Sequence, residues 1–549
     1  MIRRRVIWFV VLLAVIFTLQ ACGGGGSSSS GGASAGAVNV SLVDAPGDYD
    51  NVWVTVKDVW FHTSAEAGPD DQGWIKYPLR SPVLIDLAAL SNGSMSQNIW
   101  NGIELPAGVY RQIRLFLVET NAANPPFGHD HFNEAVWGGS TFPLRIPDAD
   151  GGISLVGTFP VTNGSTLRLA IDFNVGDDVV DFNGSEYILK PRLACFDLDN
   201  VGAIVGQIST GAVFDKAAHF VIKAESLSTG GTGTHHVVHR STSPDSRGKF
   251  ILFPVSAATA TYDVLIRGIG YETTIVKEVP VSSGTTTMFS PTKLPVISMI
   301  TGSDYVSSAT ITSPTGAWVD FYQTLTSTGT GTEYPYEVRF RHFNPITGSF
   351  SGFMLSNSPL RWGVYSSISS TITFTAADPA ECVSGAGCYQ AVAGADEELY
   401  NSSGFPGSII TSSSPTVTFD PLTVMSPWQG NKITGVISLS SPTAMTGKMN
   451  TGVVLAVHRG LIVNAISTFE DTLPASVVST GGTYTISNLP GGTATTPLPS
   501  AFYAVDAVFW ASPPVPEPYQ AIAFPPQFAD LRTGDGTANL TMYWFRCWW

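Results

Sequence analysis

Apolar and polar residues alternate along many short runs of this chain, and this pattern constrains its fold more than any other feature. The first run has apolar residues at every second position, Val38, Val40 and Leu42. The same spacing recurs in three later runs: Val52, Val54, Val56; Ile113, Leu115, Leu117; and Leu167, Leu169, Ile171, Phe173. A period of two is typical of half-buried strands. Positive-φ turns are expected at Asn92-Gly93, Asn101-Gly102, Asn163-Gly164 and Asn183-Gly184. With one short helix expected near residues 84–90, the pattern up to residue 200 predicts an antiparallel β-sandwich.

The amino terminus has the pattern of an export signal that ends at a cysteine. Three arginines precede an apolar run over residues 6–19, which is short for a membrane span but suits a secretory signal. Leu19-Gln20-Ala21-Cys22 resembles the lipobox of bacterial lipoproteins. The resemblance implies cleavage before Cys22, lipidation of its sulfur and durable anchoring by several acyl chains. The alternative is an ordinary signal peptide with an incidental Cys.

Residues 22–37 follow as the lipidated Cys and a Gly/Ser-rich tether, a composition that behaves as a flexible coil. Gly23 stands directly after the cysteine, where Asp is absent. This resembles the outer-membrane default of lipoprotein sorting. We therefore expect an exported outer-membrane lipoprotein, on either the periplasmic or the cell-surface face.

Charge and length limit the partners and the number of domains. Without residues 1–21 the chain has 25 Lys and Arg against 43 Asp and Glu, a net charge of −18. Such a surface repels nucleic acid, which is not expected as a partner. A mature length of about 530 residues suggests several domains of roughly 100 to 170 residues. No apolar stretch beyond the signal reaches the roughly 18 residues of a spanning helix. The acyl chains alone are therefore expected to hold the protein at the membrane.

Four cysteines remain after lipidation. Cys382 and Cys388 flank a flexible Ser-Gly-Ala-Gly loop, and we predict that they form a disulfide in an oxidising compartment. Cys195 and Cys547 are left over. They either pair with each other or stay as two buried free thiols, and the sequence leaves both alternatives open.

A family resemblance covers the first predicted domain, about residues 38–198. The segments that carry it are Val40-Ser41-Leu42-Val43-Asp44-Ala45-Pro46-Gly47-Asp48-Tyr49-Asp50, Val52-Trp53-Val54-Thr55-Val56, Ile85-Asp86-Leu87, Leu105-Pro106-Ala107-Gly108-Val109-Tyr110, Ile113-Arg114-Leu115, Phe142-Pro143-Leu144 and Ile188-Leu189-Lys190-Pro191. They resemble a bacterial lipoprotein family catalogued as domain of unknown function 4382. The resemblance implies a β-rich envelope domain and no chemistry.

The rest of the chain resembles carboxypeptidase-regulatory-like, transthyretin-type sandwiches. Its segments are Gly202-Ala203-Ile204-Val205-Gly206, Tyr262-Asp263-Val264-Leu265-Ile266, Ile433-Thr434-Gly435-Val436-Ile437 and Gly482-Thr483-Tyr484-Thr485-Ile486. We predict sandwiches at residues 38–200, 201–293, 294–428 and 429–549, the third being a degenerate repeat. Such modules strung end to end would form a semi-rigid stalk or rod, and the resemblance implies spacing and binding.

Two kinds of polar cluster are weak candidates for a metal site. The first turn holds Asp44, Asp48 and Asp50, and a later loop holds His129, His131 and Glu134. Carboxylates in loops suit calcium, and His with a carboxylate suits zinc. Further acidic loops carry Asp148, Asp150, Asp177, Asp178 and Asp181, and a second His cluster has His235, His236 and His239. Asp in turns also caps its own backbone, and a solvated loop is the other interpretation, so no site is assigned.

Tryptophans are dense in the first domain, at positions 53, 60, 74, 100 and 137. Exposed indoles bind sugars or proteins, but the same residues could fill the core of the sandwich. No His-Glu-x-x-His, phosphate-loop or Cys-x-x-Cys motif occurs, and outside the Gly/Ser-rich tether there is no Gly-x-Ser-x-Gly nucleophile elbow. We expect no catalytic residues and no cofactor, with calcium the one open alternative.

These patterns favour a non-catalytic, lipid-anchored envelope protein that serves as a binding, adhesion or scaffolding element. Its expected partners are the membrane, through the lipid anchor, and an envelope protein, a glycan or an extracellular filament. One alternative is a secreted hydrolase or metal-dependent enzyme that acts on polysaccharide or peptide. Another is a structural subunit of a surface assembly or filament.

Overall fold

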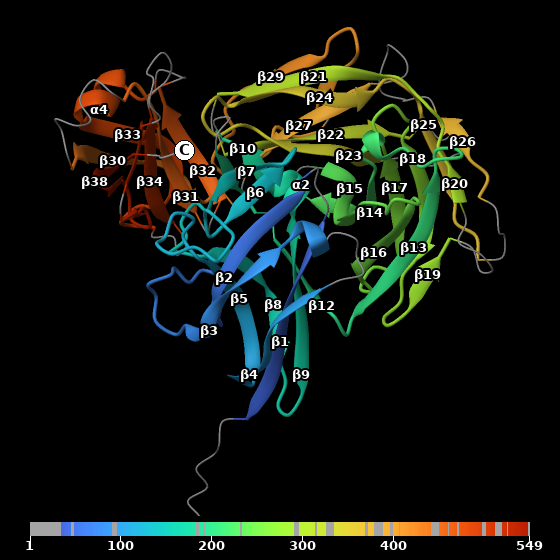
Figure 1. The fold of residues 1–549 in the computed structure, drawn as a ribbon, viewed down its shortest axis with the longest axis horizontal. Helices are drawn as coiled ribbons and strands as arrows, with labels where there is room; N and C mark the ends of the chain where they lie inside the picture. The colour runs from blue at the N-terminus through green and yellow to red at the C-terminus, as the bar shows by residue number, and fades with distance from the viewer. Residues whose placement is uncertain are drawn as a thin grey trace, which may run out of the picture.

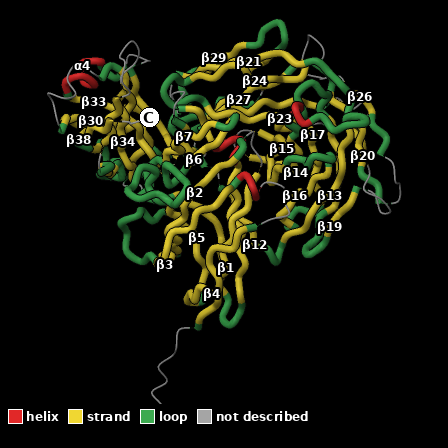
Figure 2. The backbone as a smooth tube through the Cα atoms, in the orientation of Figure 1, coloured by secondary structure: helices red, strands yellow, loops and turns green. Residues whose placement is uncertain are grey.

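A computed structural model shows that the chain is built almost entirely of β-strands (Figures 1 and 2), which confirms the predicted all-β fold. It describes residues 34–45, 49–90, 96–182, 186–191, 193–230, 233–289, 296–312, 316–325, 334–367, 372–377, 388–395, 399–405, 407–440, 449–458, 461–468, 472–496, 501–510, 519–523 and 525–546. The lipobox with Cys22 lies outside these residues. Among the described helices, none has the length and apolar character needed to cross a membrane.

Module 1, which we define as β1 to β12, is a two-sheet sandwich. Its elements are β1 (Ala35–Ala45), β2 (Asn51–His62), β3 (Ile75–Asp86), a 3-10 helix (Ala88–Leu90), β4 (Gln97–Pro106), β5 (Gly108–Leu117), β6 (Glu134–Trp137), β7 (Ser140–Arg145), β8 (Ile153–Val161), β9 (Thr166–Asn174), α2 (Val175–Asp178), β10 (Val179–Asp181), β11 (Tyr187–Leu189) and β12 (Ala194–Asp197). One sheet has the order β12-β9-β1-β4. The other has the order β10-β11-β7-β6-β2-β5-β8, with β3 also paired to β2.

The larger sheet of module 1 is buried on both faces, as β5 shows. Ile113, Leu115 and Leu117 point into the sandwich core. Gln112, Arg114 and Phe116 alternate with them and therefore lie on the opposite face, yet they are also buried. A second layer must therefore cover that face.

Modules 2 and 3 share hydrogen-bonded strands. Module 2 contains β13 (Val201–Ser209), a 3-10 helix (Lys216–Ala218), β14 (Val221–Gly230), β15 (Gly233–Thr242), β16 (Lys249–Ser256), β17 (Thr261–Arg267), β18 (Thr274–Pro280), β19 (Thr286–Met288) and β20 (Val296–Ser298). Module 3 contains β21 (Asp304–Ile311), β22 (Trp318–Thr324), β23 (Pro335–His342), β24 (Ser349–Ser356), β25 (Leu360–Val364), β26 (Thr375–Ala377), β27 (Tyr389–Gly394), β28 (Ser408–Ile410) and β29 (Thr416–Phe419). Strand β25 pairs in parallel with β18, so it extends a module 2 sheet. The exact domain limits stay a prediction.

Module 4 is built around one strongly curved sheet. Its elements are β30 (Gln429–Leu439), β31 (Thr451–His458), β32 (Leu461–Ser467), α4 (Ala475–Thr480), β33 (Gly482–Gly491), β34 (Phe502–Trp510), β35 (Tyr519–Ala523), β36 (Gln527–Asp530), β37 (Gly536–Thr537) and β38 (Leu540–Arg546). The sheet order is β32-β31-β34-β35-β38-β30-β33. Its two end strands approach each other, since the Asn464 side-chain amide donates to the Ser487 carbonyl at 2.9 Å.

The modules pack around one another, so the rod expected from the sequence is wrong. Figure 1 shows module 4 beside module 1, module 2 on the other side of α2, and most of module 3 above α2. An apolar cluster joins modules 1 and 4 through Phe182, Ile188, Val453, Leu455 and Val508. The physical reason is that sheet faces which solvent would cover in a rod are apolar here, and burying them against another module is favourable.

The predicted turns are partly confirmed. Asn163-Gly164 lies in the turn between β8 and β9, and Gly164 has φ of +69°. Gly102 also has positive φ, +65°, but Asn101-Gly102 lies inside β4 at an irregularity of its pairing with β1. The other two Asn-Gly pairs lie outside the described residues. An Asn-Gly pair thus indicates the backbone conformation, while the partner strand decides between turn and bulge.

Arg240 joins module 2 to module 1 and provides a first test. Its guanidinium, fully buried, donates to Asp172 on β9, to the Asp44 carbonyl at 2.7 Å and to the Phe253 carbonyl at 3.0 Å. Arg240→Met would leave the Asp172 carboxylate buried without its partner, so we expect a loss of about 3–5 kcal/mol in the free energy of unfolding.

Denaturant titration measures this loss. The matched control is Arg168→Ala, which breaks an exposed pair with Asp199 whose side chains are about half exposed, and its cost should stay below about 1 kcal/mol. Equal losses in the two variants would contradict a role for the buried pair.

Candidate functional site at the contact between modules 1 and 4

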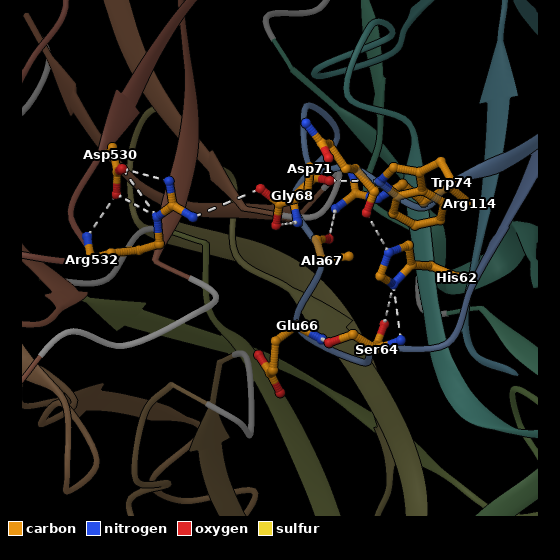
Figure 3. A network of polar contacts seen from close by, with 11 residues as sticks. His62, Ser64, Glu66, Ala67, Gly68, Asp71, Trp74, Arg114, Asp530 and Arg532 are labelled. Carbon is orange, nitrogen blue, oxygen red and sulfur yellow. Dashed lines mark hydrogen bonds and ion pairs between the residues drawn. The ribbon is translucent and has the colours of Figure 1, made fainter. Parts of the chain in front are cut away.

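The loop between β2 and β3 is the module 1 side of this contact, and it is tightly organised (Figure 3). His62, at the end of β2, accepts from the Ser64 N–H through Nδ1 at 2.9 Å. Its Nε2 therefore carries the hydrogen and donates to the Gln72 carbonyl at 3.0 Å. The imidazole thus ties the two ends of the loop together.

Trp74 and Asp71 hold the middle of the same loop. The indole N–H of Trp74 donates to the Gly68 carbonyl at 2.8 Å, and the Gly68 N–H donates to Asp71 Oδ2 at 2.9 Å. Gly73 has φ of +103°, and a Cβ there would lie 2.9 Å from His62 Nε2. The loop conformation therefore requires glycine at that position.

Arg114 anchors the loop to the sheet beneath it. The guanidinium is buried and donates to the Ala67 carbonyl at 3.1 Å and to the Gly151 carbonyl. It also lies over the Trp74 ring, 5.4 Å from the ring centroid. One β5 side chain thereby fixes two loops of module 1, those before β3 and before β8.

Module 4 meets this loop through Arg532 and two phenylalanines. Arg532 pairs with Asp530 at 2.7 Å and reaches Asp71 of module 1 at 3.8 Å (Figure 3). The Phe502 and Phe528 rings stack at 5.5 Å, and Arg532 lies over Phe502. These pairs are partly exposed, so they orient the contact more than they stabilise it.

A narrow cleft remains between the two modules. It is lined by Glu66, Ala67, Gly68, Pro69, Arg114, Asp148, His458, Phe502, Ala504 and Phe528. Its cavity volume is about 20 Å³, which is room for about one water molecule. Carboxylates, a guanidinium, an imidazole and aromatic rings converge here around this small volume.

Asp148 is the titratable group of the cleft with the clearest pKa shift. Burial raises its pKa from 3.8 to about 7, although the Gly151 N–H donates to Oδ1 at 2.7 Å and Arg114 lies near. At neutral pH the carboxyl is therefore partly protonated, and its ionised form is disfavoured inside the contact.

A buried ion pair completes the contact next to the cleft. Arg145, at the end of β7, donates through Nη2 to Asp506 of β34, and Glu186 lies 3.9 Å from its other nitrogen. All three side chains are buried. A buried pair of this kind constrains geometry, because separating its members leaves uncompensated charge.

Of the weak metal candidates in the first turn, the structure describes Asp44 and Asp50, and these two have different surroundings. Asp44 is fully buried, where it accepts from the Val175 N–H at 3.1 Å, and burial together with Asp172 raises its pKa well above the usual range. Asp50 is exposed and accepts from the Gly139 N–H at 3.0 Å. Asp48 lies outside the described residues.

The second candidate set does come together, around Glu134. The Asp130 and His131 N–H groups donate to Glu134 Oε1 at 2.7 and 2.8 Å, and His129 Nδ1 lies 2.7 Å from Oε2. The carboxylate thereby organises its own loop. Within the described ranges, no group of three or more His, Cys, Asp or Glu could hold a metal ion.

The remaining acidic loops also use their carboxylates locally. Asp177 and Asp178 accept from the Asn174 side-chain amide and backbone N–H at 2.6 and 3.0 Å, Asp150 lies 3.8 Å from Lys57, and Asp181 is exposed at the end of β10. Backbone capping was one of the two roles that the sequence left open for these residues.

The tryptophans of module 1 divide between its core and its surface, and a role in binding stays a prediction. Trp100 is buried in the sandwich core. The ring centroids of Trp60 and Trp74 lie 5.8 Å apart on the outer face, where Lys76 Nζ lies 3.4 Å from the centroid of the Trp60 ring. The Trp53 ring contacts His129. Trp137 is 55% exposed at the tip of the β6–β7 hairpin.

Two of the four cysteines that follow Cys22 lie in the part of the chain that the structure describes. Cys195, on β12, is a free thiol, and burial raises its pKa to about 12. Cys388 is buried, while Cys382 and Cys547 lie outside the described residues. The Cys382–Cys388 disulfide therefore stays a prediction.

Sequence patterns missed the residues that build the contact, above all Arg114, Arg145 and Asp506. Each sits at a position where an alternating strand is expected to face solvent. Arg114 stands between two core residues, and a surface Arg would give the same pattern. The signal that was available is the nearly continuous apolar run of β34, which is buried along most of its length. A strand that is apolar on both faces indicates that a further layer covers its sheet.

Asp148→Asn should stabilise the protein at alkaline pH. The folded protein holds a proton on Asp148 up to about pH 7, and the unfolded chain loses it near 3.8. Stability is therefore lost as the pH rises through this window. The amide removes that loss, so we expect no gain at about pH 4 and at most about 4 kcal/mol above about pH 8.

Urea unfolding at the two pH values measures the gain. The control is Asp150→Asn, which changes an exposed carboxylate on the same loop and should alter stability by less than about 1 kcal/mol. A gain for Asp148→Asn that does not depend on pH would contradict the assignment.

Among the comparisons with known proteins, a family match covers a defined segment of the chain, residues 35–191. No protein of curated function matches the chain. The Bacillus anthracis TIE protein is 9% identical over 90% of this chain and 69% of its own, with a TM-score of 0.13. A streptococcal ancillary pilin is 8% identical over 71% and 99%, with a TM-score of 0.12. Likenesses at this level say nothing about function. A family described as "Domain of unknown function (DUF4382)" matches residues 35–191, which lie within module 1.

Proposed function

We propose that this protein is a non-catalytic, lipid-anchored envelope protein that presents a rigid β-body for binding, adhesion or scaffolding. Acylated Cys22 and the Gly/Ser-rich tether that precedes β1 would hold it at the outer membrane. The partner would be an envelope protein, a glycan or an extracellular filament. The net charge of −18 on the mature chain argues against nucleic acid.

One observation carries this proposal, namely the closed contact between the first and last modules. Arg145 and Asp506 with the surrounding apolar cluster fix module 4 against module 1. The free ends of β1, β4 and β9 lie at the opposite pole of module 1 (Figure 1). A tether entering at β1 would thus hold the other three modules away from the lipid as one body.

The shape of the cleft and the exposed aromatics agree with binding. The cleft accommodates about one water molecule, and its Arg114 and Asp148 are engaged by loop backbone. Phe127 is fully exposed at the tip of the loop that Glu134 organises, and Trp137 is largely exposed. Rigidly presented aromatic side chains lose little entropy on binding and are common anchors.

Cys22→Ala should release the protein from membranes. Without the thiol no acyl chain can be attached, so we expect loss of labelling by a fatty-acid analogue and recovery in the soluble fraction. The control is Cys195→Ala, which should leave labelling and fractionation unchanged. Membrane recovery and labelling of the Cys22→Ala protein at the wild-type level would contradict lipidation at this residue.

Phe127→Ala and Trp137→Ala should reduce partner capture by the intact protein. Each change removes a large exposed apolar surface that contributes to no core, so the unfolding midpoint should not change while cross-linking yields in intact cells fall several-fold. Val213→Ala, an exposed residue of module 2, is the control. Turnover of a substrate by the purified protein, abolished by one polar replacement, would instead support the hydrolase alternative.

A further inference from the structure

Two sheet edges meet where module 2 contacts module 3, and no strand pairing joins them. β15 is the end strand of one sheet and β23 the end strand of another. The two strands lie side by side, in the centre right of Figure 1. An unpaired edge exposes backbone N–H and C=O groups, so these groups of β23 must find partners elsewhere.

Ionisable side chains of module 2 supply those partners. His236 Nδ1 lies 3.1 Å from the Pro335 carbonyl. Glu225 Oε2 accepts from the Glu337 N–H at 3.1 Å. Lys223 Nζ donates to the Glu337 carbonyl at 3.3 Å and to its carboxylate at 3.0 Å. We call this set of contacts the β23 seam.

His236 faces an acceptor with each ring nitrogen. Nδ1 faces the Pro335 carbonyl, which cannot donate, and Nε2 lies 3.6 Å from Asp263 Oδ2. The ring stacks on Tyr336 at 3.7 Å, and the Tyr336 hydroxyl donates to the same Asp263 oxygen at 2.5 Å. Only the doubly protonated imidazolium offers a hydrogen to both acceptors.

Glu225 needs a proton for a different reason. It is fully buried, and its Oε1 has no hydrogen-bond partner. The charged groups around it are Lys223 on its own strand, Asp263 of β17 and Glu337 of β23, while Asp177 of α2 acts on Lys223. Burial raises the pKa of Glu225 well above its usual range, and the two nearby carboxylates add to this.

We propose that the β23 seam is a pH-sensitive clasp, closed when His236 and Glu225 hold their protons and loosened as the pH rises. Loss of the His236 proton leaves one ring nitrogen facing an oxygen lone pair. Loss of the Glu225 proton places a third carboxylate beside Asp263 and Glu337. Both groups bind protons more tightly in the closed form, so both favour opening in the same direction of pH. Opening would release the backbone edge of β23.

Hydrogen exchange at the β23 amides of the whole protein tests the clasp. After correction for intrinsic rates, protection of the Glu337 amide should fall about tenfold or more between about pH 5.5 and about pH 8.5. Amides of β1, which is paired on both sides, should keep their protection. Constant protection of Glu337 over this range would overturn the proposal, even if no variant folds.

Variants separate the two groups. Glu225→Gln keeps an oxygen acceptor but cannot ionise, so it should retain protection of β23 at about pH 8.5. His236→Gln removes the positive charge and should lower protection already at about pH 5.5. The matched control is His239→Gln on the same strand, since His239 bonds Ser226 within module 2 at 2.7 Å and should leave the pH response unchanged. A wild-type response in both Glu225→Gln and His236→Gln would overturn the assignment.

Discussion

Buried charge at the module contacts is the constraint on which the arrangement of this protein depends. Arg240 with Asp172, Lys223 with Glu337, and Arg145 with Asp506 each cross from one module to another. A pair of this kind adds little net stability, because desolvation offsets most of the attraction, but separating its members is costly. Each contact therefore admits one geometry, and the four modules, which were expected to follow one another in a rod, form one body.

Backbone carbonyls that are buried at the module contacts also accept hydrogen bonds from cationic side chains. Arg240 of module 2 binds the Asp44 carbonyl of module 1, and Lys223 of module 2 binds the Glu337 carbonyl of module 3. Burial of a sheet edge or a loop between modules removes water from its carbonyls, which then require donors. Long cationic side chains reach such carbonyls across a contact where strand pairing cannot.

The period-two runs were sufficient to predict the strands, since Val52, Val54 and Val56 do line the core as expected. The pattern could not predict partners distant in sequence. β1 pairs in parallel with β9, and β25 joins a sheet of module 2, although their sequences resemble any other half-buried strand. Asp44 was expected in the first turn but lies in β1 and is buried, because alternation tells which face a residue is on and not what covers that face. The same limit hid the contact between modules 1 and 4.

The environment of Cys195 has a consequence for the maturation of the protein. The thiolate is the species that attacks disulfides, and a thiol whose pKa is about 12 is almost never ionised near neutrality. Once β12 has paired with β9, this sulfur therefore reacts slowly as a nucleophile. Oxidative pairing elsewhere in the chain would then proceed without competition from Cys195, provided that the first sandwich folds before the oxidant arrives.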